Sequence, residues 1–112
     1  MDILEYHRDG ALVIAPHGRV DSTTSVTLDE RLRHHLGAGA RRVVVDLAQV
    51  DYISSAGLRV MLALAKRLRE VQGTLVLCAM TEPVRQVFEL AGFVPLFTVD
   101  TTLDVALARL SP

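Results

Sequence analysis

The stretch 41–73 joins a β-branched apolar run to a helical pattern through a short polar loop. Its first part, RRVVVDL, is typical of a strand that is buried on both faces of a parallel sheet. From Leu58 onward apolar residues recur at helical spacing, while Arg59 and Lys66 occupy the opposite side. The loop at 54–57 follows the carboxyl end of the strand, where open α/β sheets usually meet their ligands. We therefore expect the function of the chain to reside at this loop.

Strand and helix patterns alternate along the rest of the chain. An Asp-Gly pair between two apolar runs near the start predicts a tight hairpin of antiparallel strands. The predicted strands cover residues 2–8, 11–18, 41–47, 74–79 and 94–99. The predicted helices begin after Asp21 or Ser22, at the serine loop, at Thr81 and at Thr101. This order predicts an α/β fold. We expect a single domain over residues 1–112, with a mostly parallel central sheet, an antiparallel edge and about four helices.

The composition is that of an ordinary globular chain with little net charge. Its 112 residues are 50% hydrophobic and include 12 basic and 13 acidic side chains, for a net charge of −1. No basic patch stands out, so neither nucleic acid nor an anionic membrane is expected as a main partner. The longest apolar run is far shorter than the roughly 18 residues of a membrane helix, and the acidic start is unlike a signal peptide. These features predict a cytoplasmic protein.

Patterns for catalysis and metal binding are absent from the sequence. It has no GxxxxGK phosphate loop, no GxGxxG and no GxSxG elbow. The single cysteine, Cys78, lies in the apolar run TLVLCA and is expected to be a buried thiol. We predict no catalytic residues, no metal and no cofactor. The histidines lack ligand spacing, and we expect all of them at the solvated surface: His7, His17, His34 and His35.

The serine pair of the loop has two possible roles on physical grounds alone. Serine before a helix commonly caps it, because its oxygen accepts a hydrogen bond from an early backbone N–H. At about 100° per residue, Ser54 falls on the buried side of the helix and Ser55 near the border with Arg59. Ser54 is therefore the better cap, and Ser55 the better exposed hydroxyl.

The segment VVVDLAQVDYISSAGLRVMLAL resembles the central motif of the STAS family, which includes the anti-sigma factor antagonists. In that family an apolar strand leads into a short loop with a serine or threonine, a glycine-leucine pair and an apolar helix. The upstream GRVDSTTS resembles the family's second characteristic segment, with Asp21 at its acidic position. The predicted order of elements is similar to the family fold over nearly the whole chain.

The resemblance implies a site and a mechanism. Ser55 matches the serine that is phosphorylated in family members that act in partner-switching circuits, and Gly57 and Leu58 match the glycine-leucine pair. Ser54 stands where aspartate is common and is a rival phosphoacceptor, while Ala56 stands where a second hydroxyl is common. The implied partners are an anti-sigma factor that is a serine kinase and a serine phosphatase. The implied partner-binding residues are Asp21, Ser22, Ser54, Ala56, Gly57, Leu58 and Arg59.

Two functions of other classes stay open beside partner switching. One is a non-switching scaffold or accessory subunit, because members of the STAS family also serve in membrane-transport assemblies. The other is a small enzyme that uses the region of Asp21, Asp46 and Ser55 at the carboxyl edge of the sheet. Helix capping and loop hydrogen bonds explain these aspartates, and Asp51, equally well.

Overall fold

A tight hairpin begins the sheet of the computed structural model, which describes residues 1–111. β1 (Asp2–Arg8) pairs antiparallel with β2 (Ala11–Val20). Between them Asp9 and Gly10 have φ values of 53° and 79°. A two-residue turn with both values positive matches the twist of the flanking strands, which is why Asp-Gly is common there. The predicted hairpin is confirmed.

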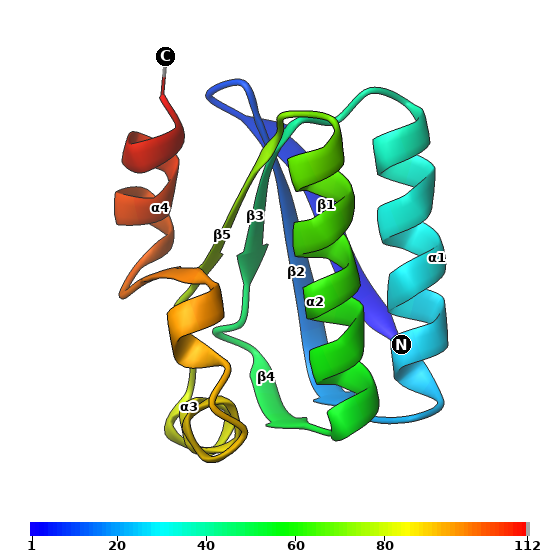
Figure 1. Ribbon diagram of the computed structural model, residues 1–112, viewed down its shortest axis with the longest axis vertical. Coiled ribbons are helices and arrows are strands. Elements are labelled where there is room, and N and C mark those ends of the chain that lie inside the picture. Colours follow the sequence, from blue (N-terminus) through cyan, green and yellow to red (C-terminus); the bar gives the residue numbers. More distant parts are fainter. Residues whose placement is uncertain (112) are drawn as a thin grey trace.

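A mostly parallel sheet follows the hairpin (Figure 1). Its strand order is β1-β2-β3-β5-β6, and only β1 runs against its neighbour. The part of the chain that the structure describes holds four α-helices and a six-stranded sheet, which confirms the predicted fold class. The remaining elements are α1 (Thr24–Gly37), β3 (Arg42–Asp46), β4 (Val50–Ile53), α2 (Ser55–Glu70), β5 (Thr74–Cys78), α3 (Glu82–Leu90), the 3₁₀ turn η1 (Val94–Leu96), β6 (Thr98–Asp100) and α4 (Leu103–Leu110).

The short strand β4 extends the sheet where β2 continues past β3. β2 pairs with β3 from Leu12 to Ile14 and with β4 from Gly18 to Val20, in parallel both times. β4 was not predicted, because its four residues are buried, exposed, exposed and buried in turn. That order lacks the alternation by which a strand with one solvated face is recognised.

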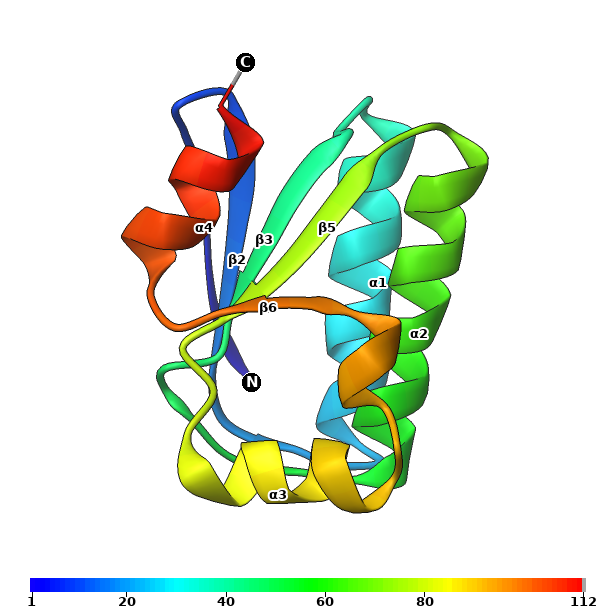
Figure 2. The same cartoon turned by 60° about the vertical axis from the view of Figure 1, so that its left-hand side comes forward.

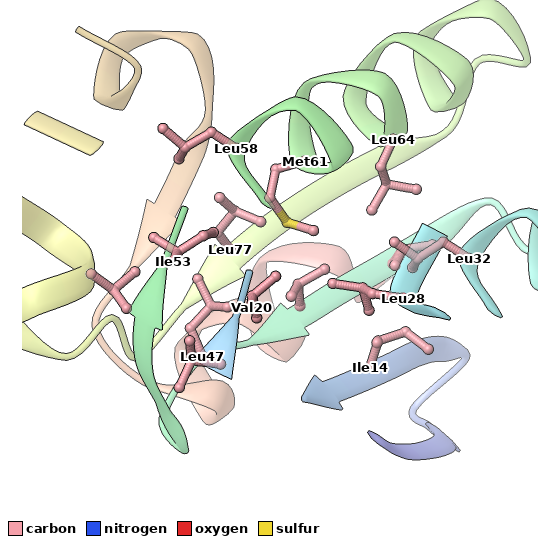
Figure 3. Close-up of a cluster of buried hydrophobic side chains, with 14 of the residues drawn as sticks. Ile14, Val20, Leu28, Leu32, Leu47, Ile53, Leu58, Met61, Leu64 and Leu77 are labelled. Carbon is pink, nitrogen blue, oxygen red and sulfur yellow. The ribbon is translucent and has the colours of Figure 1, made fainter. Parts of the chain in front are cut away.

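Helices cover both faces and one end of the sheet. α1 and α2 lie side by side on one face and α4 on the other, while α3 lies across the end toward which the parallel strands run (Figures 1 and 2). The larger core fills the space between the sheet and the α1–α2 pair. There Leu28 and Leu32 of α1 and Met61 and Leu64 of α2 point toward Ile14 of β2 (Figure 3). A smaller apolar cluster lies between the sheet and α4.

The smaller cluster contains the only cysteine. Cys78 is buried in β5, and its desolvation, with the nearby carboxylates of Asp46 and Asp100, raises the pKa of its thiol to about 12. A neutral thiol in such surroundings packs as a small apolar side chain. The prediction of a buried thiol is confirmed.

The segment after α3 differs from the single strand predicted for residues 94–99. Its first half forms η1, and β6 follows only after that turn. Pro95 stands in the first turn of η1, where its missing N–H leaves no bond unmade. The cap of α4 lies one residue later than the predicted Thr101. It is Thr102, whose Oγ1 accepts a hydrogen bond from the Val105 N–H at 3.1 Å.

One histidine, His35, is not solvated as predicted. Its Nε2 lies 2.7 Å from Oε1 of Glu5 on β1, and its side chain is only 19% exposed. Arg31 donates two hydrogen bonds to the same carboxylate, at 3.0 and 2.6 Å, and these hold the pKa of Glu5 below its usual value. The three side chains tie the edge strand β1 to α1. The expectation of solvated histidines is therefore wrong for His35.

Candidate functional site at the start of α2

The start of α2 lies at the end of the fold toward which the parallel strands run, beside the start of α1 (Figures 1 and 2). β2 leads into α1 through residues 21–23, and β4 leads into α2 through Ser54 alone. Because β2 and β4 pair at Val20 and Ile53, the two connections are neighbours. The two segments that resemble the family's motifs are thereby brought together in space.

Ser54 closes β4 and caps α2. Its N–H donates to the Val20 carbonyl of β2 at 2.8 Å, and its own carbonyl accepts from the Leu58 N–H at 3.0 Å. Its Oγ accepts from the Gly57 N–H at 3.4 Å, a long bond that engages one of the free donors at the helix start. Ser54 is half-buried. The prediction that Ser54 is the cap is confirmed.

Ser55 is the first residue of α2 and is exposed, as predicted. As the first residue of α2, it belongs to the turn whose free backbone N–H groups form the positive end of the helix dipole. Ala56 beside it is half-buried, and Arg59 is exposed one turn further along. The surface of the first turn of α2 therefore presents one exposed hydroxyl, with a guanidinium one turn away.

Gly57 allows α2 to approach the sheet more closely than a larger residue would. A Cβ at this position would lie 2.6 Å from Cγ1 of Ile53, 2.8 Å from Cγ1 of Val20 and 3.1 Å from the Val20 carbonyl oxygen. The next residue, Leu58, is 5% exposed and belongs to the larger core. Gly57 and Leu58 therefore position the serine pair from beneath and add little surface of their own.

Asp21 organises the neighbouring connection and caps α1. Its Oδ1 accepts from the N–H groups of Thr23 and Thr24, both at 3.0 Å, and its own N–H donates to Oγ1 of Thr24 at 2.9 Å. These bonds, above all the one from the Thr24 N–H, hold the pKa of Asp21 below its usual value. Ser22 is exposed between them. The role of Thr24 was missed in the sequence, although the D-x-x-T spacing is the signal for it.

A contact between Arg19 and Tyr52, which was not predicted, lies beside Asp21. Arg19 of β2 and Tyr52 of β4 are partners in the sheet, and the Arg19 guanidinium lies 4.3 Å from the centre of the Tyr52 ring. Both side chains are exposed, so this cation–π contact adds a cationic and aromatic element to the rim of the site. No local pattern predicts the pair, because it depends on β4 pairing with β2.

The aspartates of this edge support loops. Asp46, at the end of β3, accepts from the Ala48 N–H at 3.0 Å and so holds the turn toward β4. Asp51 is exposed on β4. Within residues 1–111, no group of three His, Cys, Asp or Glu side chains is placed to hold a metal ion. Over that same range, every helix is too short or too polar to cross a bilayer.

Known proteins resemble this chain over nearly its whole length. Residues 3–106 match the family model of the STAS domain. A protein of Bordetella bronchiseptica named anti-sigma factor antagonist BtrV is 48% identical over 100 residues, which cover 89% of this chain and 86% of that protein. The crystal structure of an anti-sigma factor antagonist from Mycobacterium paratuberculosis has 25% sequence identity and a TM-score of 0.90, with 99% of this chain and 94% of that chain covered.

A third relative shares the fold at lower identity. It is the Bacillus protein SpoIIAA in its unphosphorylated form, with 21% identity, a TM-score of 0.84 and coverage of 97% of this chain and 96% of that one. Anti-sigma factor antagonists of this kind are regulatory binding proteins and not enzymes, which agrees with the prediction that this chain is not an enzyme. The match over residues 3–106 and the 48% identical relative both point to one conclusion: the chain belongs to the STAS domain family.

Proposed function

We propose that this protein is an anti-sigma factor antagonist that acts by partner switching. In its unphosphorylated form it binds an anti-sigma factor that is itself a serine kinase, and so frees a sigma factor. Phosphorylation of Ser55 by that kinase dissolves the complex, and a serine phosphatase restores the binding form. The chain 1–112 performs this role as a single STAS domain in the cytoplasm.

One observation carries the proposal: Ser55 offers an exposed hydroxyl, while its neighbour Ser54 already serves as the cap of α2. A kinase requires a hydroxyl that it can reach in the folded protein, and Ser55 meets this requirement without any opening of the helix. Gly57 and Leu58 lie beneath and hold it there. The surface around it, which we propose as the partner-binding site, is contributed by Asp21, Ser22, Ser54, Ala56 and Arg59.

The charge of a phosphate explains release without refolding. A phosphoserine adds about 1.5 to 2 negative charges at pH 7. At Ser55 it would lie at the positive end of the helix dipole, so α2 is expected to stay folded. In a complex the same charge must be desolvated, at a cost that for buried charged groups is several kcal/mol. Since each ~1.4 kcal/mol is tenfold in affinity, a loss of about 3 kcal/mol weakens binding more than about a hundredfold.

Two relatives support the proposal. The 48% identical BtrV is named an anti-sigma factor antagonist, and it covers most of this chain. SpoIIAA has been solved in its unphosphorylated and its phosphorylated form, and both resemble this chain, with TM-scores of 0.84 and 0.76. In that protein, phosphorylation is therefore compatible with the fold that the two chains share.

The test uses the two serines as matched variants. Wild type, Ser55→Ala and Ser54→Ala are each incubated with the cognate anti-sigma factor and ATP, and the added mass is located by mass spectrometry. We expect phosphate on wild type and Ser54→Ala and none on Ser55→Ala, which should still bind the anti-sigma factor in calorimetry. Ser55→Asp should bind weakly. Equal phosphorylation of wild type and Ser55→Ala would contradict the assignment, and indifference of all three to the kinase would favour a non-switching scaffold.

A further inference from the structure

The exposed face of α2 continues from Ser55 as a stripe of cationic and apolar residues. At about 100° per residue, Arg59, Leu62, Lys66 and Arg69 all lie within about 40° of Ser55 around the helix axis. The three basic side chains are exposed, and Leu62 is half-buried. The stripe, which we call the α2 outer face, therefore runs from the proposed phosphoacceptor to the last turn of the helix.

The positive charge of the α2 outer face is not neutralised by ion pairs within residues 1–111. Across residues 1–111, the ion pairs formed by side chains do not include Arg59, Lys66 or Arg69. Arg67, on the side of α2 that faces α1, shows the contrast, since it lies 3.1 Å from Asp29. The one acidic residue of α2 is Glu70, at its end. A chain with net charge −1 thus places three free cations on one face of one helix.

An apolar groove runs beside two of these cations, Lys66 and Arg69, between α2 and η1. A hollow of about 460 Å³ there is lined by Leu62, Ala65, Lys66, Arg69, Pro95 and Leu96. Leu96 is 53% exposed and forms the η1 side of this hollow. A second hollow of about 190 Å³ shares Ala65, Arg69 and Leu96 and continues the groove toward β5 and β6.

We propose that the α2 outer face and this groove bind an acidic segment of the anti-sigma factor, with an apolar side chain seated between Leu62 and Leu96. The inference rests on the function proposed above and names the chemistry of the partner. Carboxylates of the partner complement the three free cations, and an apolar side chain of the partner fills the hollow between Leu62 and Leu96. A nucleic acid fits less well. Protein surfaces that bind nucleic acid are polar and strongly positive throughout, and a nucleic acid has no apolar side chain to fill this groove.

This surface gives the phosphate on Ser55 a second effect. Ser55 and Arg59 are four residues apart on one helix, so a phosphate on Ser55 competes directly with the partner's carboxylates for Arg59. Phosphorylation then places a negative charge at one end of a surface that selects acidic groups. In this switch, the phosphate on Ser55 therefore replaces the partner's carboxylates as the negative group that pairs with Arg59.

The first experiment uses calorimetry to measure the affinity of the full chain for its anti-sigma factor. That anti-sigma factor is the kinase to which the Ser55→Ala variant still binds in the test above. The triple variant Arg59→Glu, Lys66→Glu, Arg69→Glu should bind at least tenfold more weakly at low salt, and the difference should shrink in 0.5 M salt because exposed charges are screened. The control is Arg8→Glu, an exposed arginine of β1 that forms an ion pair with exposed Asp104. It should bind as wild type does. Equal affinity of the triple variant and wild type would overturn the inference.

The second experiment locates the partner segment. A photo-crosslinking amino acid at Leu62 or Leu96 should crosslink the anti-sigma factor through a segment rich in Asp and Glu, while the same group at exposed Leu4 of β1 should not. Crosslinks to a segment without acidic residues, or tighter binding of duplex DNA than of the kinase, would also overturn the inference. Neither result touches phosphorylation of Ser55, whereas a chain that binds no anti-sigma factor would refute the proposed function and this inference together.

Discussion

Replacement of Gly57 by alanine tests whether the start of α2 is held by close approach to the sheet. The new Cβ would lie 2.6 Å from Cγ1 of Ile53 and 2.8 Å from Cγ1 of Val20. Both neighbours are β-branched strand residues with 1% exposure, so their side chains have little freedom to move aside. α2 itself must therefore shift away from β2 and β4.

The magnitude follows from two opposing effects. Alanine is favoured over glycine within a helix by about 1 kcal/mol. A methyl group forced into a filled site costs about 1–3 kcal/mol, and two contacts this short against stiff neighbours place Gly57→Ala at the upper end. The net loss in the free energy of unfolding is about 2 kcal/mol. For a domain near this size that lowers Tm by about 8 °C.

Thermal and urea unfolding, followed by circular dichroism, measure this loss. The matched control is Gly37→Ala at the end of α1, where a Cβ would meet nothing within 4 Å and where helix propensity favours alanine. Gly37→Ala is expected to be as stable as wild type or slightly more so. In the background of Val20→Ala, which removes one of the clashing atoms, Gly57→Ala should cost less than it does in wild type. Gly57→Ala with wild-type stability would refute the reasoning.

Three further predictions concern the core and the cap of α1. Because the pKa of Asp21 is lowered on folding, the ionised carboxylate stabilises the fold above pH about 4, and this contribution is lost as the pH falls through the lower pKa of the folded state; urea unfolding should show Asp21→Ala less stable than wild type at pH 7, with the difference shrinking as the pH falls below about 4. Leu64→Ala, at a fully buried site between α2 and the sheet, should cost about 3 kcal/mol in the same assay. With its pKa raised to about 12, the thiol of Cys78 should react with Ellman's reagent at pH 8 only after unfolding.

The helix and strand pattern of this chain is predictable where local signals agree with the tertiary environment. The β-branched run at 43–45 is buried on both faces, and Leu58, Met61, Leu64 and Leu68 of α2 face the larger core. The Asp-Gly turn needs two positive φ values, which these two residue types tolerate. In each case one local rule and one packing requirement favour the same structure, and the prediction holds.

The predictions fail where contacts between residues distant in sequence determine the local structure. β4 forms because the end of β2 has free backbone groups to pair with, and no alternation in its own residues marks it. His35 is drawn from solvent by Glu5, which is distant in sequence and meets it only when β1 packs on α1. The contact of Arg19 with Tyr52 depends in turn on β4. At the site, the serine pair and Asp21 were found from the sequence, whereas the rim that β4 contributes was not.

The two candidate phosphoacceptors differ in the residue that lies one helical turn further along α2. Four residues after Ser54 comes Leu58, which is buried, and four residues after Ser55 comes Arg59, which is exposed and forms no ion pair within residues 1–111. A phosphate on Ser54 would be attached to the oxygen that accepts from the Gly57 N–H, at a half-buried position one turn from an apolar side chain. A phosphate on Ser55 gains both the helix dipole and Arg59.

Phosphoserine incorporated at position 55 should therefore raise the Tm, and phosphoserine at position 54 should lower it. Arg59→Gln should remove part of the gain at 55 and raise the pKa of that phosphate in phosphorus NMR, because the neighbouring cation that favours the dianion is lost. At position 54, where the residue one turn along is Leu58, the same substitution should change neither value. If Arg59→Gln left both values unchanged at position 55 as well, Arg59 would not distinguish the two serines, and the preference for Ser55 would rest on its exposure alone.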